Sequence, residues 1–264
     1  ITALSAVAIQ NANQIQTKLD SQKLDEEIRV ASDIQKQLLP AKLPVTETVL
    51  FGSVFRPAAV IGGDYYDFFE LETGHIGIII ADIIGKGVPA ALYMAMFKTL
   101  VQIHSHRTNQ PAELLNYLNK IMANDSLFNR FIPTFYAVLD PKTRSFTYCN
   151  AGHEPPLWIH NQKSCFLKAT APPLGLAYAT HYQQRDIKLS DNDIICLFTD
   201  GLIEARNSHN EAYGYRRLKK RIAKYQHLSG QYFVNRLHND VTSFSTGHPQ
   251  HDDLTIVVLS CSAS

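Results

Sequence analysis

Four short motifs, each built around an aspartate, contain the residues of this chain best suited to chemistry. They occur in a fixed order, at Gly62-Gly63-Asp64, 81–87, 198–201 and 252–255. Carboxylate oxygens are hard ligands that suit Mg²⁺ or Mn²⁺ rather than zinc or an iron–sulfur cluster. Two carboxylates about 4 Å apart repel by roughly 1 to 4 kcal/mol, so a cluster of four requires cations. One Asp-Gly pair alone is typical of a turn, but the four motifs together predict a divalent-metal site.

The elements around the motifs must bring these aspartates together. We expect each aspartate at the end of an apolar, strand-like run, where its carboxylate can reach a shared cleft. Hydrophobic periodicity predicts helices over 1–39, 89–104, 111–126, 215–225 and 230–244. It predicts strands over 49–55, 76–81, 134–139, 145–150, 157–160, 164–167, 183–188, 194–198 and 254–259. Because the strands come in runs separated by pairs of helices, we expect largely antiparallel sheets covered by helices, an α+β fold.

The first 39 residues differ in composition from the rest of the chain. They contain no Gly or Pro, and prolines follow at positions 40 and 44. Apolar residues recur there at spacings of four, three and seven, at Leu24, Ile28, Ala31 and Leu38. Such a narrow stripe suits packing against a partner helix or the edge of a domain, including a coiled coil. We therefore divide the chain into a linker or regulatory helix over 1–44 and a catalytic domain over 45–264.

Length and charge restrict the class of protein. The chain has 264 residues, of which 45% are hydrophobic, enough to bury a sizeable core. Its formal net charge is +1, from 25 basic and 24 acidic residues, which argues against binding nucleic acid or an anionic membrane through a global field.

The cysteines and termini indicate the cellular compartment. Cys149, Cys165, Cys196 and Cys261 show no CxxC spacing, which favours a reduced, cytoplasmic protein. No apolar stretch reaches the roughly 18 to 20 residues that span a bilayer, so we expect no membrane contact by this segment. Because the chain starts at Ile1 rather than Met, we expect a fragment of a longer protein with an upstream sensor or anchor.

Six stretches of the chain closely resemble the SpoIIE/RsbU-type serine phosphatases, the bacterial branch of the metal-dependent (PPM, type 2C-like) protein phosphatases. The stretches are 62–67, 81–92, 150–157, 174–175, 199–207 and 252–255. The resemblance covers about residues 28–260, and residues 31–40 look like the regulatory helix that precedes the catalytic core. It implies a four-layer αββα sandwich, two antiparallel sheets with helices outside, and a centre of two Mn²⁺ or Mg²⁺ ions at one edge.

The resemblance also implies a ligand for each position. Asp82 would bridge both metals, and the backbone carbonyl of Ile83 would complete one coordination sphere. Asp64 would hold one metal, directly or through water. Asp200 and the pair Asp252 and Asp253 would hold the other, and the sequence leaves open which of that pair binds directly. Asp82 and Asp200 are the predicted catalytic residues.

The implied chemistry is metal-assisted hydrolysis. Two ions roughly 3.5 to 4 Å apart can hold and activate a water and neutralise the phosphoryl oxygens during in-line attack. No covalent intermediate is then needed, and the sequence contains neither a CxxxxxR loop nor a G-x-S-x-G elbow.

Other polar residues are candidates for phosphate binding, structural support or docking. Arg56 and Arg206 are candidates to orient the phosphate, whereas Asp67, His153 and Glu204 are better explained as structural residues. The basic helix with Arg216, Arg217, Lys219, Lys220, Arg221 and Lys224 is interpreted as a solvated face that could also dock an acidic substrate protein.

The leading hypothesis is a phosphatase acting on phosphoserine or phosphothreonine of a partner protein, in this branch typically a STAS-domain anti-anti-sigma factor. One alternative is a non-catalytic phosphoprotein-binding module that dimerises through its N-terminal helix, but no metal aspartate is lost. Another is a nucleotide cyclase of the Gly-Gly-Asp-Glu-Phe type, which requires an acidic residue where Tyr65 stands.

Overall fold

Two antiparallel sheets form the centre of the molecule. The computed structural model describes residues 2–72, 74–83, 85, 87–124, 131–178 and 180–262. The first sheet has the strand order β1 (Val49–Arg56), β10 (Leu254–Cys261), β9 (Ile194–Phe198), β6 (Leu157–His160), β7 (Lys163–Phe166). The second has the order β2 (Asp64–Glu70), β3 (Ile76–Asp82), β4 (Thr134–Asp140), β5 (Ser145–Ala151), β8 (Arg185–Lys188). All neighbouring strands in both sheets run antiparallel.

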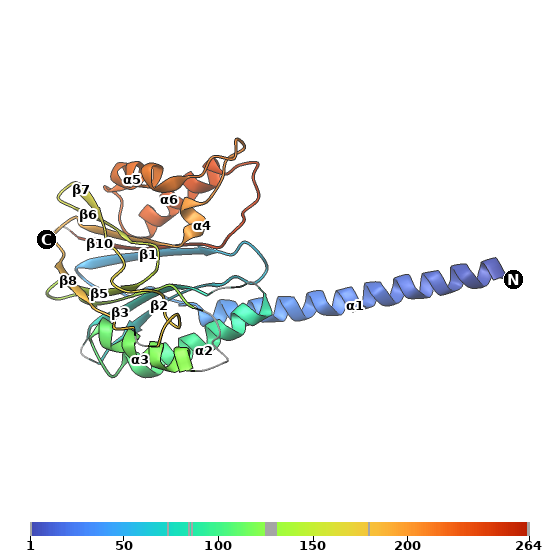
Figure 1. The fold of residues 1–264 in the computed structure, drawn as a ribbon. Coiled ribbons are helices and arrows are strands. Elements are labelled where there is room, and N and C mark those ends of the chain that lie inside the picture. The colour runs from blue at the N-terminus through green and yellow to red at the C-terminus, as the bar shows by residue number, and fades with distance from the viewer. Residues whose placement is uncertain are drawn as a thin grey trace.

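Helices cover the outer face of each sheet (Figure 1). The first sheet carries α4 (Asp200–Ile203), α5 (Gly214–Tyr225) and α6 (Gly230–Phe244), and the second carries α2 (Val88–Ser105) and α3 (Pro111–Asn124). Three buried apolar clusters fill the three gaps between these four layers. The predicted αββα sandwich is therefore confirmed.

Strand β3 shows how the sequence encodes this layering. Ile79 packs into the cluster beneath α2 and α3, whereas its neighbours Ile78 and Ile80 pack into the cluster between the two sheets. Because both faces of the strand are buried, its sequence reads as a continuous apolar run instead of an alternating one. The first charged side chain of the strand is that of Asp82, its last residue, at the margin of the core.

The N-terminal helix α1 (Thr2–Leu38) ends just before Pro40, as predicted. Its last turns pack against α2, and the rest projects away from the sandwich (Figure 1). Of the predicted stripe, Leu38 packs on the core and Ile28 and Ala31 are half-buried, whereas Leu24 is exposed. Only the C-terminal part of the stripe thus contacts the sandwich.

Most of the predicted elements are present within one or two residues of their predicted bounds, and two were missed. Strand β2 and the short helix α4 were not predicted. The expectation that each motif aspartate ends a strand-like run was also wrong for two of them, since Asp64 begins β2 and Asp252 precedes β10. Residues 125–126 of the predicted second core helix, and Ile84 and Lys86 of the second motif, lie outside the described residues.

The four cysteines differ in their exposure to solvent. Cys149, Cys196 and Cys261 are buried free thiols and Cys165 is an exposed one. Among the helices of the described residues, none combines the length and hydrophobicity that a bilayer-spanning segment requires.

Candidate metal centre

Asp64 and Asp82 lie directly opposite each other on neighbouring strands. Asp64 is the first residue of β2 and Asp82 the last of β3, and the two are paired in antiparallel register. Asp64 is buried, with 3% of its surface exposed, whereas Asp82 is half-buried. Burial raises the pKa of the Asp64 carboxyl well above its ordinary value, and the charge of Asp82 raises it further. The pairing therefore places two mutually repelling carboxylates at one edge of the second sheet.

Two threonine hydroxyls hold the Asp64 carboxylate from the other sheet. Oγ1 of Thr199 and Oγ1 of Thr255 each donate to Oδ2 of Asp64 at 2.6 Å. The N–H of Thr255 donates in turn to Oγ1 of Thr199 at 3.0 Å. The two hydrogen bonds from the threonine hydroxyls to Asp64 favour its ionised form. They lower its pKa and so offset part of the increase that burial causes. Neither threonine was predicted as a site residue, although each belongs to one of the four motifs. Thr199 directly precedes Asp200, and Thr255 follows Asp253 by two residues.

Asp253 points into the protein and organises the loop before Asp64. It is 3% exposed, and its Oδ1 accepts from the N–H of Ala58 at 2.7 Å. Its Oδ2 accepts from the N–H groups of Gly63 and Asp64. A side chain at Gly62 would clash with this carboxylate, because a Cβ there would lie 2.4 Å from Oδ2. All of these contacts assign Asp253 to the support of the loop.

Asp252 is oriented differently from its neighbour. It is half-buried, and its Oδ1 accepts from the N–H of Asp253 at 3.0 Å. Its charge acts on Asp200 and is the second-largest cause of the shift in the pKa of that carboxyl. The two neighbours thus differ, since the charge of Asp252 acts on Asp200 whereas the carboxylate of Asp253 accepts from N–H groups in and next to the loop before Asp64.

Asp200 is the first residue of helix α4 and is separated from β9 only by Thr199. Burial, then the charges of Asp252, Glu204 and Glu154, raise the pKa of Asp200 to about 6. The close approach of the 252–253 backbone explains the glycine that follows, because a Cβ at Gly201 would lie 2.0 Å from the carbonyl oxygen of Asp253. The Asp-Gly pair here is required by packing and is not merely a turn.

The carbonyl of Ile83 faces the same loop. The N–H of Ile83 donates to the carbonyl of Gly63 at 3.1 Å, and the side chain of Ile83 is buried. A Cβ at Gly63 would lie 2.4 Å from the oxygen of Ile83 and 2.9 Å from that of Gly85. Only glycine at position 63 therefore allows these two carbonyls to approach the strand that begins at Asp64.

The aspartates form two neighbouring pairs, Asp64 with Asp82 and Asp200 with Asp252. In the part of the chain that the structure describes, no three Asp, Glu, His or Cys side chains converge as a ready-made metal cage. The groups that shift the pKa values of Asp64 and Asp200 are carboxylates, hydroxyls and a backbone N–H. A donor set made only of oxygen, with mutual repulsion, fits a hard divalent cation.

Helix α1 is hydrogen-bonded to the loop that precedes Asp64. Nε2 of Gln35 donates to the carbonyl of Gly62 at 2.6 Å, and the N–H of Gly62 donates to Oε1 of Gln35 at 3.0 Å. Oγ of Ser32 donates to the carbonyl of Val60 at 2.8 Å. These two residues were not predicted as functional, although Gln35 lies on the same helical face as Ala31 and Leu38.

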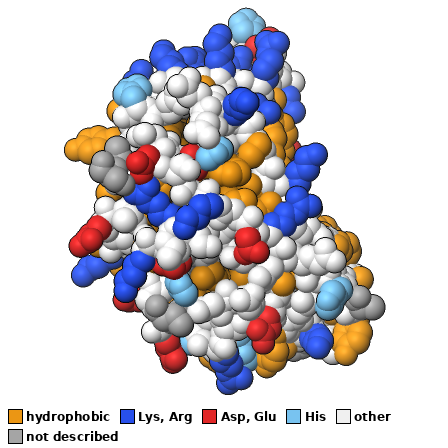
Figure 2. Space-filling view, turned by 90° about the vertical axis from the view of Figure 1, so that its left-hand side faces the viewer, with side chains coloured by type: hydrophobic (Ala, Val, Ile, Leu, Met, Phe, Trp, Pro, Cys, Tyr) orange, Lys and Arg blue, Asp and Glu red, His pale blue; other side chains and the backbone are white. Residues whose placement is uncertain are grey.

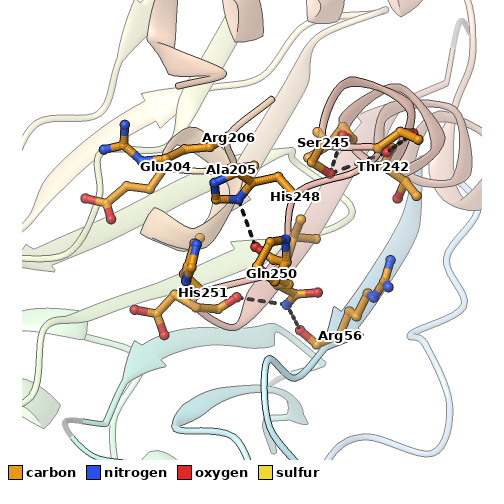
Figure 3. A pocket seen from close by; sticks show the side chains of 15 residues that line it. Arg56, Glu204, Ala205, Arg206, Thr242, Ser245, His248, Gln250 and His251 are labelled. Carbon is orange, nitrogen blue, oxygen red and sulfur yellow. Dashed lines mark hydrogen bonds between the residues drawn. The ribbon is translucent and has the colours of Figure 1, made fainter. Parts of the chain in front are cut away.

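A pocket of about 330 Å³ adjoins the Asp200–Asp252 pair. It lies between the segment after α4 and the segment that joins α6 to β10 (Figure 3). Arg56 and Arg206, the two candidates to orient a phosphate, both line it. The guanidinium of Arg206 donates to the carbonyl of Asn210 at 2.9 Å and so belongs to its own loop. Gln250 Nε2 donates to the carbonyls of Arg56 and Asp252, both at 2.8 Å, and fixes the pocket wall.

His153 and Asp67 have structural surroundings, as expected. His153 is buried, its N–H donates to Asn150 Oδ1 and its Nδ1 contacts the carbonyl of Glu154. Burial lowers the pKa of His153 to about 4, so its imidazole is neutral at pH 7. Asp67 is buried in β2, where it pairs with Lys98 of α2 and accepts from the hydroxyl of Tyr65 at 3.0 Å.

Comparisons with known protein sequences found matches over most of the chain. A sequence profile of the family described as Stage II sporulation protein E (SpoIIE) matches residues 72–262. Phosphoserine phosphatase RsbU of Bacillus subtilis (strain 168) is 34% identical over 240 residues, 90% of this chain and 71% of RsbU.

Solved structures show the same fold. The SiaA-PP2C domain of Pseudomonas aeruginosa matches with a TM-score of 0.81 at 21% identity, over 91% of this chain and 98% of that domain. RsbX, solved in complex with magnesium, matches with a TM-score of 0.62 at 18% identity, over 84% of this chain and 99% of RsbX. At such low identity these two likenesses concern the fold alone.

Proposed function

Since this chain belongs to the Stage II sporulation protein E family and is a serine/threonine phosphatase, we propose that it hydrolyses phosphoserine or phosphothreonine on a partner protein. The observation that carries the proposal is the arrangement of Asp64, which faces Asp82 on one side and is bonded to Thr199, the neighbour of Asp200, on the other. This arrangement brings three of the motifs to one edge of the sandwich. The proposed setting is the cytoplasm, where phosphoproteins of signalling systems occur.

The proposed cofactors are two Mn²⁺ or Mg²⁺ ions. Asp82 and the carbonyl of Ile83 would hold one ion together with Asp64, and Asp82 would reach the second ion, held by Asp200 and Asp252. The magnesium in the RsbX structure supports this choice of ion. Ions bound there would supply the Lewis-acid chemistry that activates water and neutralises a phosphoryl group. The protein's own task is to hold repelling carboxylates in place. The two threonines do so for Asp64, and Asp253 fixes the loop that precedes it.

Asp252 is the proposed direct ligand of the 252–253 pair. The two oxygens of Asp253 already accept three backbone N–H groups, whereas Asp252 is half-buried and acts on Asp200. Asp253 would therefore position the Asp64 loop without needing to contact a metal.

Residues 1–44 are proposed to form a regulatory linker and 45–264 the catalytic domain. Gln35 and Ser32 support this division, because they connect α1 to the backbone that leads into Asp64. A sensor domain upstream in a longer chain, or a homodimer formed through the exposed part of α1, could then act on the site by moving one helix.

The experiment that tests the activity uses a phosphorylated STAS-domain protein as substrate. Phosphate release is measured with the chain alone, with Mn²⁺, and with Mn²⁺ plus a chelator. We expect release only when the metal is free to bind. If the phosphoserine stays intact although p-nitrophenyl phosphate is hydrolysed, the STAS substrate is wrong while the phosphatase activity stands. If neither compound is hydrolysed at any metal concentration, the proposed activity is wrong.

A further inference from the structure

Helix α5, one of the three helices over the first sheet, is strongly basic, with six Arg or Lys and no Asp or Glu, whereas α6 has one Arg and one Asp. From the start of α5 to the end of α6, residues 214–244 contain seven Arg or Lys and one Asp or Glu, a net charge of +6, whereas the whole chain carries +1. Figure 2 shows basic side chains gathered along the upper rim of the molecule, the side on which α5 lies in Figure 1. The near-neutral total thus hides a local positive surface.

Part of this charge is used within the fold. Arg221 pairs with Asp240 at 3.1 Å, and the guanidinium of Arg217 lies 4.0 Å from the ring centroid of Phe244. Arg217 also donates to the carbonyls of Ala212 and Tyr213. These two arginines therefore help attach α5 to α6 and to the preceding loop.

Other cations of α5 point to solvent. Arg216 and Lys220 are exposed and four residues apart, on the helix face opposite the buried Leu218 and Ile222. In the described part of the chain, no ion pair with an acidic side chain joins Arg216, Lys220 or Lys224. Fixed like charges of this kind attract an acidic partner over about a Debye length, roughly 8 to 10 Å.

Helix α5 begins beside the candidate metal centre. The hydroxyl of Tyr215, in its first turn, donates to the carboxylate of Glu154, and its ring packs edge-on against Phe198 at 6.4 Å. Glu154 is in turn among the charges that act on Asp200. The exposed cations therefore start next to the site and continue away from it along the outer face of α5.

We propose that this basic face of α5, centred on Arg216 and Lys220, docks an acidic surface of the phosphoprotein substrate while its phosphoryl group occupies the aspartate site. The inference rests on the proposed phosphatase function. It further predicts that the preferred substrate carries negative charge on the surface that contacts α5. A protein partner is favoured over an anionic membrane because Tyr215, the neighbour of Arg216 in this face, packs against Phe198, two residues before Asp200. Electrostatic docking of this kind acts mainly on association and on KM.

The test uses two synthetic peptides with one central phosphoserine. In one peptide the flanking positions are Asp and Glu, and in the other they are Asn and Gln. We expect the wild-type protein to bind the acidic peptide about tenfold more tightly in fluorescence anisotropy, and to show a similar preference in kcat/KM that added salt removes. In the double variant Arg216→Glu/Lys220→Glu the preference should fall below about twofold, with p-nitrophenyl phosphate hydrolysis unchanged.

A matched control is Lys120→Glu/Lys142→Glu, which changes the net charge equally at exposed positions of α3 and the β4–β5 turn and should keep the preference. Equal binding of the two peptides by the wild type, or an unchanged preference in the Arg216/Lys220 variant, overturns the inference. The inference is also overturned if the protein binds phosphatidylserine vesicles through Arg216 and Lys220 but does not distinguish the two peptides. That result would assign the face to a membrane. Because anisotropy needs no turnover, docking is measured even where the phosphatase activity itself fails.

Discussion

The side-chain amide of Gln35 hydrogen-bonds both the N–H and the carbonyl of Gly62, at 3.0 Å and 2.6 Å. Gly62 stands two residues before Asp64 and packs against the carboxylate of Asp253. The last turns of α1 are therefore connected to the candidate metal centre through a single short loop. A rotation or shift of the helix cannot occur without moving that loop or breaking both hydrogen bonds.

Replacing Gln35 with alanine should loosen this loop. Each buried hydrogen bond contributes about 0.5–1.5 kcal/mol, and coupling of about 1–3 kcal/mol corresponds to a fivefold or larger change in affinity or rate. We expect Gln35→Ala to change the apparent Mn²⁺ affinity or kcat by at least about fivefold. Gln37→Ala, the same replacement at an exposed position of the helix, is the control. Superimposable metal titrations of the two variants would make Gln35 a simple packing residue.

Asp82 and Asp200 should be the residues on which turnover depends most. When either carboxylate is removed, the enzyme loses stabilisation of the charge in the transition state worth several kcal/mol. We expect Asp82→Ala and Asp200→Asn each to lower kcat by at least about a hundredfold, while circular dichroism shows an intact fold. Turnover near the wild-type rate in either variant would mean that the ligands are misassigned.

Replacing Asp253 should lower the stability of the fold, whereas replacing its neighbour Asp252 should weaken metal binding. Asp253→Ala leaves three backbone N–H groups without their acceptor. It should therefore lower the free energy of unfolding by about 2–4 kcal/mol, both with and without Mn²⁺. Asp252→Asn should leave the metal-free stability within about 1 kcal/mol and weaken Mn²⁺ binding instead. Urea unfolding and calorimetric metal titration of both variants separate the two roles, and the opposite pattern would exchange them.

The pKa of Asp200 predicts a pH-dependent stability of the metal-free protein. Its pKa is raised from 3.8 to about 6 in the folded state, so ionisation opposes folding and stability is lost as the pH rises through that window. Because Asp200 is only partly buried, we expect a loss of about 1 kcal/mol.

Asp200→Asn should remove this loss. In urea unfolding with a chelator present, the variant is expected to be about 1 kcal/mol more stable than the wild type at about pH 7, with little difference at about pH 4. Asp20→Asn, an exposed change on α1, serves as the control. A difference that is the same at both pH values would show that ionisation of Asp200 is not its cause.

Most of the helices and strands could be predicted from the sequence because hydrophobic periodicity determines them, whereas the four-layer sandwich was implied by the resemblance to the SpoIIE/RsbU-type phosphatases. Strand β2 was missed because its sequence, Asp-Tyr-Tyr-Asp-Phe-Phe-Glu, has acidic residues among its aromatic ones. Those acids are accommodated by tertiary contacts that no local pattern encodes, such as the pair of Asp67 with Lys98 of α2, 31 residues away. Tertiary structure thus overrides the local signal in this strand.

The motifs contain the aspartates that the structure brings into two neighbouring pairs, but they left open which of Asp252 and Asp253 would bind a metal directly. Asp252 and Asp253 are adjacent and chemically identical, and only the positions of the N–H groups of Ala58, Gly63 and Asp64 distinguish them. The role of Gln35 was not predicted for a related reason. A glutamine on an apolar stripe can be assigned a role only when the loop that it contacts is known.

The most direct test of the whole account is the metal dependence of phosphate-ester hydrolysis. The purified chain is treated exhaustively with EDTA, dialysed, and titrated with Mn²⁺ or Mg²⁺ while p-nitrophenyl phosphate turnover is followed. Because the groups proposed to bind the ions are carboxylates and a carbonyl, and the threonine hydroxyls of the site donate to Asp64, we expect no turnover without metal and full recovery on its return. Turnover that survives complete removal of divalent cations would contradict the metal-dependent mechanism.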